Sequence, residues 1–156
     1  MYIKDAMEAA AKQAKQTMNE NKGGPFGAAV VKDGKIIAVA SNSVLCDKDP
    51  TAHAEVNAIR LACKKLDTYD LKGCEIYATG YPCPMCLSAI IWANIKKAYV
   101  SGNIEDAESI GFRDDFIYKY IESGKKDKNI LSIDFQDEYI AKALYSEYAE
   151  KNKTIY

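Results

Sequence analysis

The sequence predicts an α/β fold: a three-layer α/β/α sandwich in which a mixed sheet of about five strands is covered by helices on both faces. Helical and strand-like patterns alternate in the order α-β-β-α-β-α-β over residues 2–101. The pair Asp33-Gly34 between two short β-prone runs favours a hairpin turn. A leading hairpin followed by βαβ crossovers implies helices on both faces of the sheet. The 156 residues correspond to a single domain, residues 1–156.

The individual elements follow from the spacing of apolar and turn-forming residues. Residues 2–20 predict a helix because apolar residues recur at helical spacing, and Gly23-Gly24-Pro25 ends it. Helix 84–93 carries a proline in its first turn, which is a favoured position. The other predicted elements are strands 28–31 and 36–40, a helix opened by Asp49-Pro50-Thr51 and running to about residue 65, strands 75–79 and 97–101, helix 114–122, strand 130–135 and helix 137–151.

Composition narrows the class of protein. The net charge of −1 argues against a nucleic-acid partner, because such surfaces usually carry a basic excess. No apolar run approaches the length of a membrane helix, and the N-terminus lacks the apolar stretch of a signal peptide. Five cysteines are an odd number, which argues against a secreted disulfide framework. We therefore expect a cytoplasmic protein without a membrane partner.

Two short motifs predict a metal site. The only histidine, His53, lies two positions before Glu55, and Cys83 and Cys86 follow in the sequence Pro-Cys-Pro-Met-Cys. This H-x-E…P-C-x-x-C pattern is the signature of zinc-dependent base deaminases. One nitrogen and two sulfur ligands suit zinc, and three protein ligands leave a fourth position open for water. The sequence therefore predicts one Zn²⁺ per chain, bound by His53, Cys83 and Cys86.

The spacing of the motifs also predicts their local structure. His53 and Glu55 cannot share a face deep inside a helix, so we expect His53 at a helix start. Cys83 and Cys86 fall at a strand-to-helix junction, where a helix N-terminus lowers the pKa of a thiol. Glu55 is the candidate proton shuttle, which would accept a proton from metal-activated water and deliver protons to the ring and the leaving amine.

Each motif alone has a simpler interpretation. A lone C-x-x-C can be a redox pair, and a lone His-x-Glu is often accidental. A structural zinc site would need a fourth ligand, for which Cys46 is the nearest candidate in sequence. Cys63 and Cys74 read as small core residues, whereas Cys46 lies in a polar stretch and can equally be a loop thiol.

Longer stretches of the chain resemble the cytidine-deaminase-like superfamily and, within it, the short bacterial guanine deaminases. The zinc motif marks the superfamily, and the blocks after residue 110 point to the guanine branch. The matching blocks are 24–28, 49–56, 58–60, 82–87, Gly111-Phe112 followed by Asp114, 116–119 and the terminal Tyr156. The resemblance implies a fold of the cytidine-deaminase-like type.

By position, the resemblance also implies roles for individual residues. Besides the zinc ligands and Glu55, it implies that the following bind the purine base: Phe26, Asn42, the backbone at Ala54, Asp114 and Tyr156. In the family, the C-terminal segment (here about 137–156) is exchanged between the subunits of a homodimer, so that Tyr156 would act in the partner's site. Tyr81 stands where these enzymes and their transfer-RNA adenosine deaminase relatives usually carry glutamate, and we expect it to influence substrate choice.

The expected function is hydrolytic deamination of a small-molecule purine base, guanine, to xanthine and ammonia. Other enzymatic readings are the deamination of another free base or aminated heterocycle, and of adenosine in transfer RNA. A non-catalytic zinc-binding module is the alternative from a different class. An intact Glu55 argues against it, because a purely structural site has no use for a proton shuttle.

Overall fold

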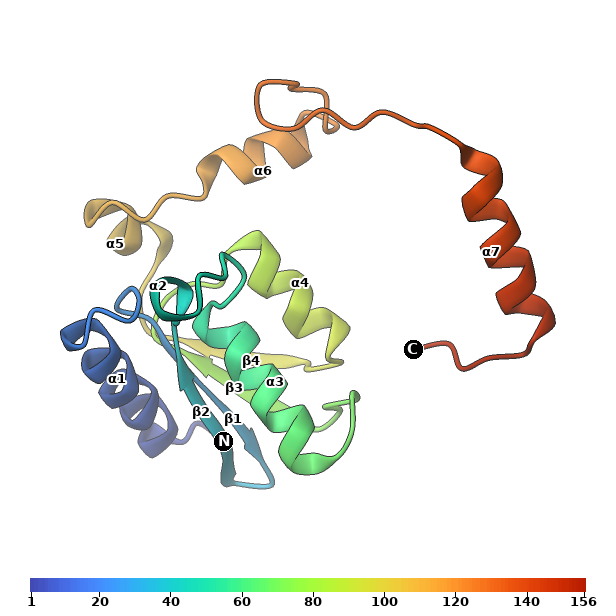
Figure 1. The fold of residues 1–156 in the computed structure, drawn as a ribbon. Coiled ribbons are helices and arrows are strands. Elements are labelled where there is room, and N and C mark those ends of the chain that lie inside the picture. Colours follow the sequence, from blue (N-terminus) through green and yellow to red (C-terminus); the bar gives the residue numbers. More distant parts are fainter. The chain divides into compact units, whose positions relative to one another are not determined.

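The computed structural model describes residues 1–156, which divide into two compact units, Met1–Asp115 and Phe116–Tyr156 (Figure 1). The elements of the first unit are α1 (Lys4–Asn19), β1 (Gly27–Lys32), β2 (Lys35–Ser41), α2 (Val44–Asp47), α3 (Ala54–Leu66), β3 (Cys74–Ala78), α4 (Pro84–Trp92), β4 (Lys97–Val100) and α5 (Ile104–Ser109). Helix α6 (Asp115–Glu122) begins at the boundary, and the second unit also contains α7 (Glu138–Glu150).

The four strands form one mixed sheet in the order β2-β1-β3-β4. Strand β1 is antiparallel to both β2 and β3, whereas β3 and β4 are parallel. The turn between β1 and β2 places Asp33 at φ 48° and Gly34 at φ 76°. Two successive positive φ angles are typical of a type I′ hairpin turn, so the predicted hairpin is confirmed.

Helices cover both faces of the sheet: α1 one face, α3 and α4 the other (Figure 1). Strand β1 carries no polar side chain from Gly27 to Val31, because both of its faces are buried. Ala28 and Val30 belong to the core shared with α3 and α4, while Ala29 and Val31 belong to the core shared with α1. Because side chains alternate between the faces of a strand, a central strand covered on both sides has no polar face. The predicted three-layer architecture is confirmed.

The predicted fifth strand, 130–135, is wrong. Ile130 lies in a turn, residues 131–135 form no regular secondary structure, and the sheet has four strands. A strand exists only where its backbone hydrogen-bonds to a neighbour, and the unit Phe116–Tyr156 contains no other strand to pair with. The sequence pattern reflects side chains that favour strands, but it contains no information about a neighbouring strand with which they could pair.

Helix α3 begins after Asp49-Pro50-Thr51, which were predicted to open it, because these residues form a turn of their own; the prediction that His53 lies at the helix start is confirmed. The carboxylate of Asp49 accepts hydrogen bonds from the backbone N–H and the hydroxyl of Thr51, at 2.8 and 2.7 Å. Such side-chain capture of the backbone competes with the helix. Helix α3 therefore starts at Ala54, with His53 as its N-cap.

The cysteines outside the metal motif lie where their sequence context suggested. Cys74 is buried in the core beneath α3, and Cys63 packs against the same core. Cys46 is exposed on the short helix α2. All five cysteines are free thiols, so no disulfide holds the fold together.

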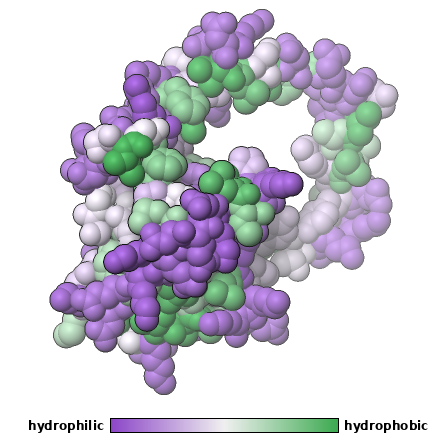
Figure 2. Space-filling view, turned by 60° about the vertical axis from the view of Figure 1, so that its left-hand side comes forward, coloured by the Kyte–Doolittle hydropathy of each residue, from purple (hydrophilic) through white to green (hydrophobic).

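The surface carries apolar as well as polar side chains (Figure 2). Half of the large exposed apolar side chains belong to residues 116–156, although these make up only about a quarter of the chain. None of the helices combines the length and the apolar character that spanning a bilayer requires.

Candidate metal centre and substrate pocket

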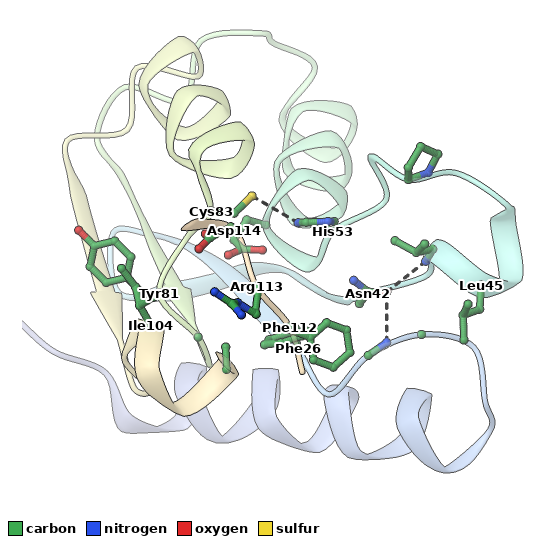
Figure 3. Close-up of a pocket in the computed structure, with 17 residues that line it drawn as sticks. Phe26, Asn42, Leu45, His53, Tyr81, Cys83, Ile104, Phe112, Arg113 and Asp114 are labelled. Atoms are coloured by element: carbon green, nitrogen blue, oxygen red, sulfur yellow. Dashed lines mark hydrogen bonds between the residues drawn. The ribbon is translucent and has the colours of Figure 1, made fainter. Parts of the chain in front are cut away.

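Three side chains that can bind a metal converge at the starts of two helices. His53 Nδ1 lies 3.5 Å from Cys83 Sγ (Figure 3) and 3.4 Å from Cys86 Sγ. All three candidate ligand atoms lie within 4.8 Å of one another. Tetrahedral zinc with bonds of about 2.3 Å to sulfur and about 2.1 Å to nitrogen separates neighbouring ligand atoms by about 3.6 Å. The spacing of the three donors therefore fits a zinc ion.

Local backbone structure explains why these side chains meet. His53 has extended backbone angles, φ −71° and ψ 156°, and caps α3, so its imidazole precedes the helix and Glu55 lies in the first turn. Cys83 caps α4 in the same way, and its sulfur accepts a hydrogen bond from the N–H of Cys86 at 3.5 Å. Pro84 takes the first helical position, where its missing N–H is not needed. Two helix N-termini thus point at one place, where negative charge is stabilised.

The electrostatics of the two cysteines suit a cation. A hydrogen bond from the Cys86 thiol, supported by His53, lowers the pKa of Cys83 to about 4. The same hydrogen bond, together with burial, raises the pKa of Cys86. Zinc binds cysteine as the thiolate, so the lowered pKa of Cys83 favours metal binding, and a bound cation would also displace the proton of Cys86. One imidazole and two thiolates are a donor set that favours zinc, and three protein ligands are typical of a catalytic site.

Glu55 is a buried carboxylate next to the candidate ligands. Its side chain is 8% exposed, and burial raises the pKa of its carboxyl group. It lines the same cavity as His53 and Cys83. A carboxyl group with a raised pKa, placed in the wall of a cavity, is suited to accepting and releasing protons during a reaction.

The cavity beside these residues has a volume of about 480 Å³. The site residues predicted from the sequence that line it are Phe26, Asn42, His53, Glu55, Tyr81, Cys83 and Asp114 (Figure 3). Cys86 and Ala54 are buried and do not line it. Tyr156 belongs to the second unit and is exposed. The first unit alone therefore brings together most of the predicted site.

The amide of Asn42 has a defined orientation. Its Oδ1 accepts hydrogen bonds from the N–H groups of Gly24 and Val44, at 3.3 and 3.1 Å (Figure 3). Only an oxygen can accept from two backbone donors, which identifies this atom as Oδ1. The Nδ2 group of this buried side chain is left to face the cavity, so Asn42 offers hydrogen-bond donors to a ligand.

One wall of the cavity is aromatic. The rings of Phe26 and Phe112 meet edge to face, with centroids 5.0 Å apart and planes at 89° (Figure 3). Asp114 also lines the cavity, and burial, with the nearby charge of Cys83, raises the pKa of its carboxyl group. Tyr81 lies at the edge of the cavity and is 48% exposed. An aromatic wall beside a few polar groups is typical of a site for a small, largely apolar ligand.

The sequence patterns did not reveal the cavity's other lining residues, several of which come from two short helices. Helix α2 contributes Val44 and Leu45, and α5 contributes Ile104 and Ala107. Helices of four and six residues are too short for an apolar period to stand out. The sequence did contain one signal for the start of α5, since Asn103 and Asp106 form a capping box there.

Comparison with known proteins gives consistent matches. Residues 2–102 match the zinc-binding region of cytidine and deoxycytidylate deaminases. The chain is 50% identical to the guanine deaminase of Bacillus subtilis over 113 residues, 72% of each chain. The X-ray structure of guanine deaminase from the same organism superposes with a TM-score of 0.91 at 40% identity, covering 100% of this chain and 99% of that one. The tRNA-specific adenosine deaminase of Aquifex aeolicus is 45% identical over 95 residues, 61% of this chain and 62% of that protein.

Proposed function

The chain belongs to the cytidine and deoxycytidylate deaminase family, whose zinc-binding region it carries, and we propose that it hydrolyses guanine to xanthine and ammonia. One observation carries the proposal: three metal-binding side chains converge, and Glu55 lies beside them in the wall of a cavity. The similarity to the Bacillus subtilis guanine deaminase supports guanine as the base. The reaction adds one water, replaces the amino group by oxygen and releases the nitrogen as ammonia.

His53, Cys83 and Cys86 would hold the zinc that this family binds. When bound, zinc lowers the pKa of water and so supplies a nucleophile at neutral pH. Glu55 would accept a proton from the attacking water and deliver protons to the ring nitrogen and to the departing amino group. Its raised pKa suits a group that must be charged to accept a proton and neutral to give it back.

The remaining cavity residues hold the base. Asn42 donates from Nδ2 to a carbonyl oxygen or ring nitrogen of the purine, since its own oxygen is already occupied. Phe26 provides an apolar wall for the ring, and Asp114 accepts from a purine N–H. The family resemblance assigns a further polar contact to the backbone at Ala54, which follows His53 directly but does not itself line the cavity. Tyr81 lies at the edge of the cavity, where it contacts the substituents that distinguish one base from another.

The working unit in this proposal is a homodimer. Residues 1–156 form one deaminase domain, whose C-terminal segment, about 137–156, is exchanged between subunits so that Tyr156 covers the base in the partner's site. Support comes from α7, where Ile140, Leu144 and Tyr148 are 51, 60 and 43% exposed at helical spacing. An apolar helical stripe of this kind needs a surface to cover it. The free cysteines fit a cytoplasmic location.

Deamination of adenosine in transfer RNA is the competing function, favoured by the similarity to tRNA-specific adenosine deaminases. The net charge of −1 speaks against it, because binding to a phosphate backbone draws on lysine and arginine side chains.

The experiment is to measure ammonia release by the zinc-loaded chain from free bases, nucleosides and transfer RNA. The proposal expects release from guanine, with xanthine as the product. Release from transfer RNA alone would instead establish the competing function, and release from another base alone would replace guanine as the substrate.

A further inference from the structure

We propose that Asn57 is a positioning residue that holds the base-binding amide of Asn42 in register with the metal ligand His53; this inference rests on the proposed function. Asn57 lies in the second turn of α3 and does not line the cavity. Its side-chain Nδ2 donates to the carbonyl oxygen of Ser41 at 2.9 Å, to Ser43 Oγ at 2.9 Å and to the carbonyl oxygen of Ala52 at 3.3 Å.

The three acceptors identify the donating atom as Nδ2 of Asn57 and show that both of its hydrogens take part in hydrogen bonds. Two of them are backbone carbonyl oxygens, which only accept, so the atom facing them must be the amide nitrogen. Ser43 Oγ donates its own hydrogen to Asp47 Oδ2 at 2.6 Å, which leaves its lone pairs for Asn57. An amide nitrogen has two hydrogens, so three acceptors share both of them. This side chain has no donor left for another role.

The hydrogen bonds join two segments that carry functional side chains. Ser41 and Ser43 flank Asn42 on either side, so Asn57 holds both of its neighbours. Ala52 directly precedes His53, and its carbonyl oxygen accepts from the N–H of Ser43 at 2.9 Å as well as from Asn57. Ser43, Ala52 and Asn57 thus form a closed set of hydrogen bonds.

This arrangement determines the relative position of base and metal. The Asn42 amide directs its donors into the cavity only while the backbone of residues 41–44 keeps its place, and His53 directs its imidazole there as the cap of α3. Asn57 and Glu55 both lie in the first turns of α3, so the hydrogen bonds of Asn57 also fix the Asn42 segment relative to Glu55. A misplacement of about 1 Å between reacting groups can lower a rate about a hundredfold. Asn57 therefore acts through Asn42 and touches neither base nor metal.

Asparagine at position 57 is unfavourable for the helix itself, and its hydrogen bonds to other segments offset that cost. Asparagine is a weaker helix former than alanine, leucine or lysine, because its side chain competes for backbone hydrogen bonds. Here the competing hydrogen bonds are satisfied outside the helix, by Ser41, Ser43 and Ala52. The sequence pattern alone would have assigned residue 57 to an ordinary interior helix position.

The test compares Asn57→Leu, which removes the donors at similar size, with Asn57→Asp, whose carboxylate faces the same acceptors. Asn19→Asp is the matched control, since Asn19 is exposed on α1. We expect both Asn57 variants to keep their zinc and to raise KM for the base that the wild type uses by about tenfold or more. The control should leave KM unchanged.

A double-mutant cycle on kcat/KM decides whether Asn57 acts through Asn42. In an Asn42→Ala background, Asn57→Leu should lose most of its effect on kcat/KM. An equal effect in both backgrounds would overturn the proposal. If Asn57→Leu acted only by destabilising the fold, it would lower the melting temperature, and its effect on kcat/KM would be the same with and without Asn42→Ala.

A second measurement needs no substrate. Hydrogen exchange of the zinc-loaded full chain should be about tenfold faster at the amides of Asn42, Ser43 and Val44 in Asn57→Leu, and unchanged at Ile76 and Tyr77 in β3. Unchanged exchange at residues 42–44 would overturn the proposal. If the wild type deaminates no base, the proposed function fails, and exchange still decides the role of Asn57. Asn57→Asp undergoes the same measurement, in case Asn57→Leu does not fold.

Discussion

Gly23 lies so close to Asn42 that no other residue fits there. A β-carbon on Gly23 would stand 2.2 Å from the carbonyl oxygen of Asn42 and 2.4 Å from its Oδ1. Real β-carbons essentially never approach another heavy atom below 3.0 Å, so any side chain at position 23 must displace Asn42. The loop that follows α1 therefore helps to position the amide of Asn42, which we propose binds the base.

Gly23→Ala should consequently weaken binding of the base. We expect KM to rise by about tenfold or more, because displacement of Asn42 removes a hydrogen bond and misaligns the ring. Zinc content should not change, since Gly23 is not one of the candidate metal ligands. Steady-state kinetics with metal analysis checks both expectations.

Gly73→Ala is the control for that variant. Gly73 has φ +82° and open space where a β-carbon would stand, so alanine there strains the backbone by about 1–2 kcal/mol without a clash at the site. It should lower the melting temperature and leave KM unchanged. A rise of KM in Gly73→Ala equal to that in Gly23→Ala would mean that reduced stability, not Asn42, is responsible.

Cys83→Ala should abolish zinc binding. It removes one of three ligands and the sulfur whose lowered pKa favours a thiolate. Metal analysis of the purified variant is the measurement, and Cys46→Ala is the control, because Cys46 is exposed on α2 and outside the cluster. Full zinc content in Cys83→Ala would remove Cys83 from the ligand set.

The sequence could predict those features of the site that depend on a few neighbouring residues, and it could not predict those that depend on contacts between distant segments. The H-x-E and C-x-x-C motifs each occupy one helix start, so their chemistry and backbone could be read directly. The Asp33-Gly34 turn was equally local. By contrast, the contacts of Asn57 and Gly23 with the Asn42 loop span 14 to 19 residues and depend on tertiary packing. Strand 130–135 failed for the same reason, since pairing is not a local property.

Tyr81→Glu should change the preference among bases. Tyr81 lies at the edge of the cavity, and a carboxylate there would accept hydrogen bonds from an amino-purine edge that a tyrosine hydroxyl meets less well. We expect the ratio of kcat/KM between guanine and other amino-purines to shift by about tenfold. Tyr69→Glu, at an exposed residue outside the cavity, controls for the added charge. Identical ratios in wild type and Tyr81→Glu would show that residue 81 only shapes the turn and has no part in substrate choice.

Deletion of Ile155 and Tyr156 should lower deamination and leave zinc in place. Both side chains are more than 80% exposed, and in the proposed dimer they cover the base bound to the other subunit. Mixing the deleted chain with Glu55→Gln should restore activity, because the Glu55→Gln chain supplies its tail to the intact site of the deleted chain. No recovery after verified subunit exchange would exclude a swapped tail, and full activity of the deletion alone would exclude a role in catalysis.

The most direct measurement is xanthine formation from guanine by the zinc-loaded wild type and by Glu55→Gln, with zinc determined in the same samples. We expect the wild type to form xanthine and ammonia in equal amounts. Glu55→Gln should keep one zinc per chain, bound by His53, Cys83 and Cys86, and lose about 10²–10⁴-fold in turnover, because it cannot transfer protons. No xanthine from the zinc-loaded wild type, or more than about a tenth of its activity in Glu55→Gln, would contradict zinc-dependent guanine deamination with Glu55 as proton shuttle.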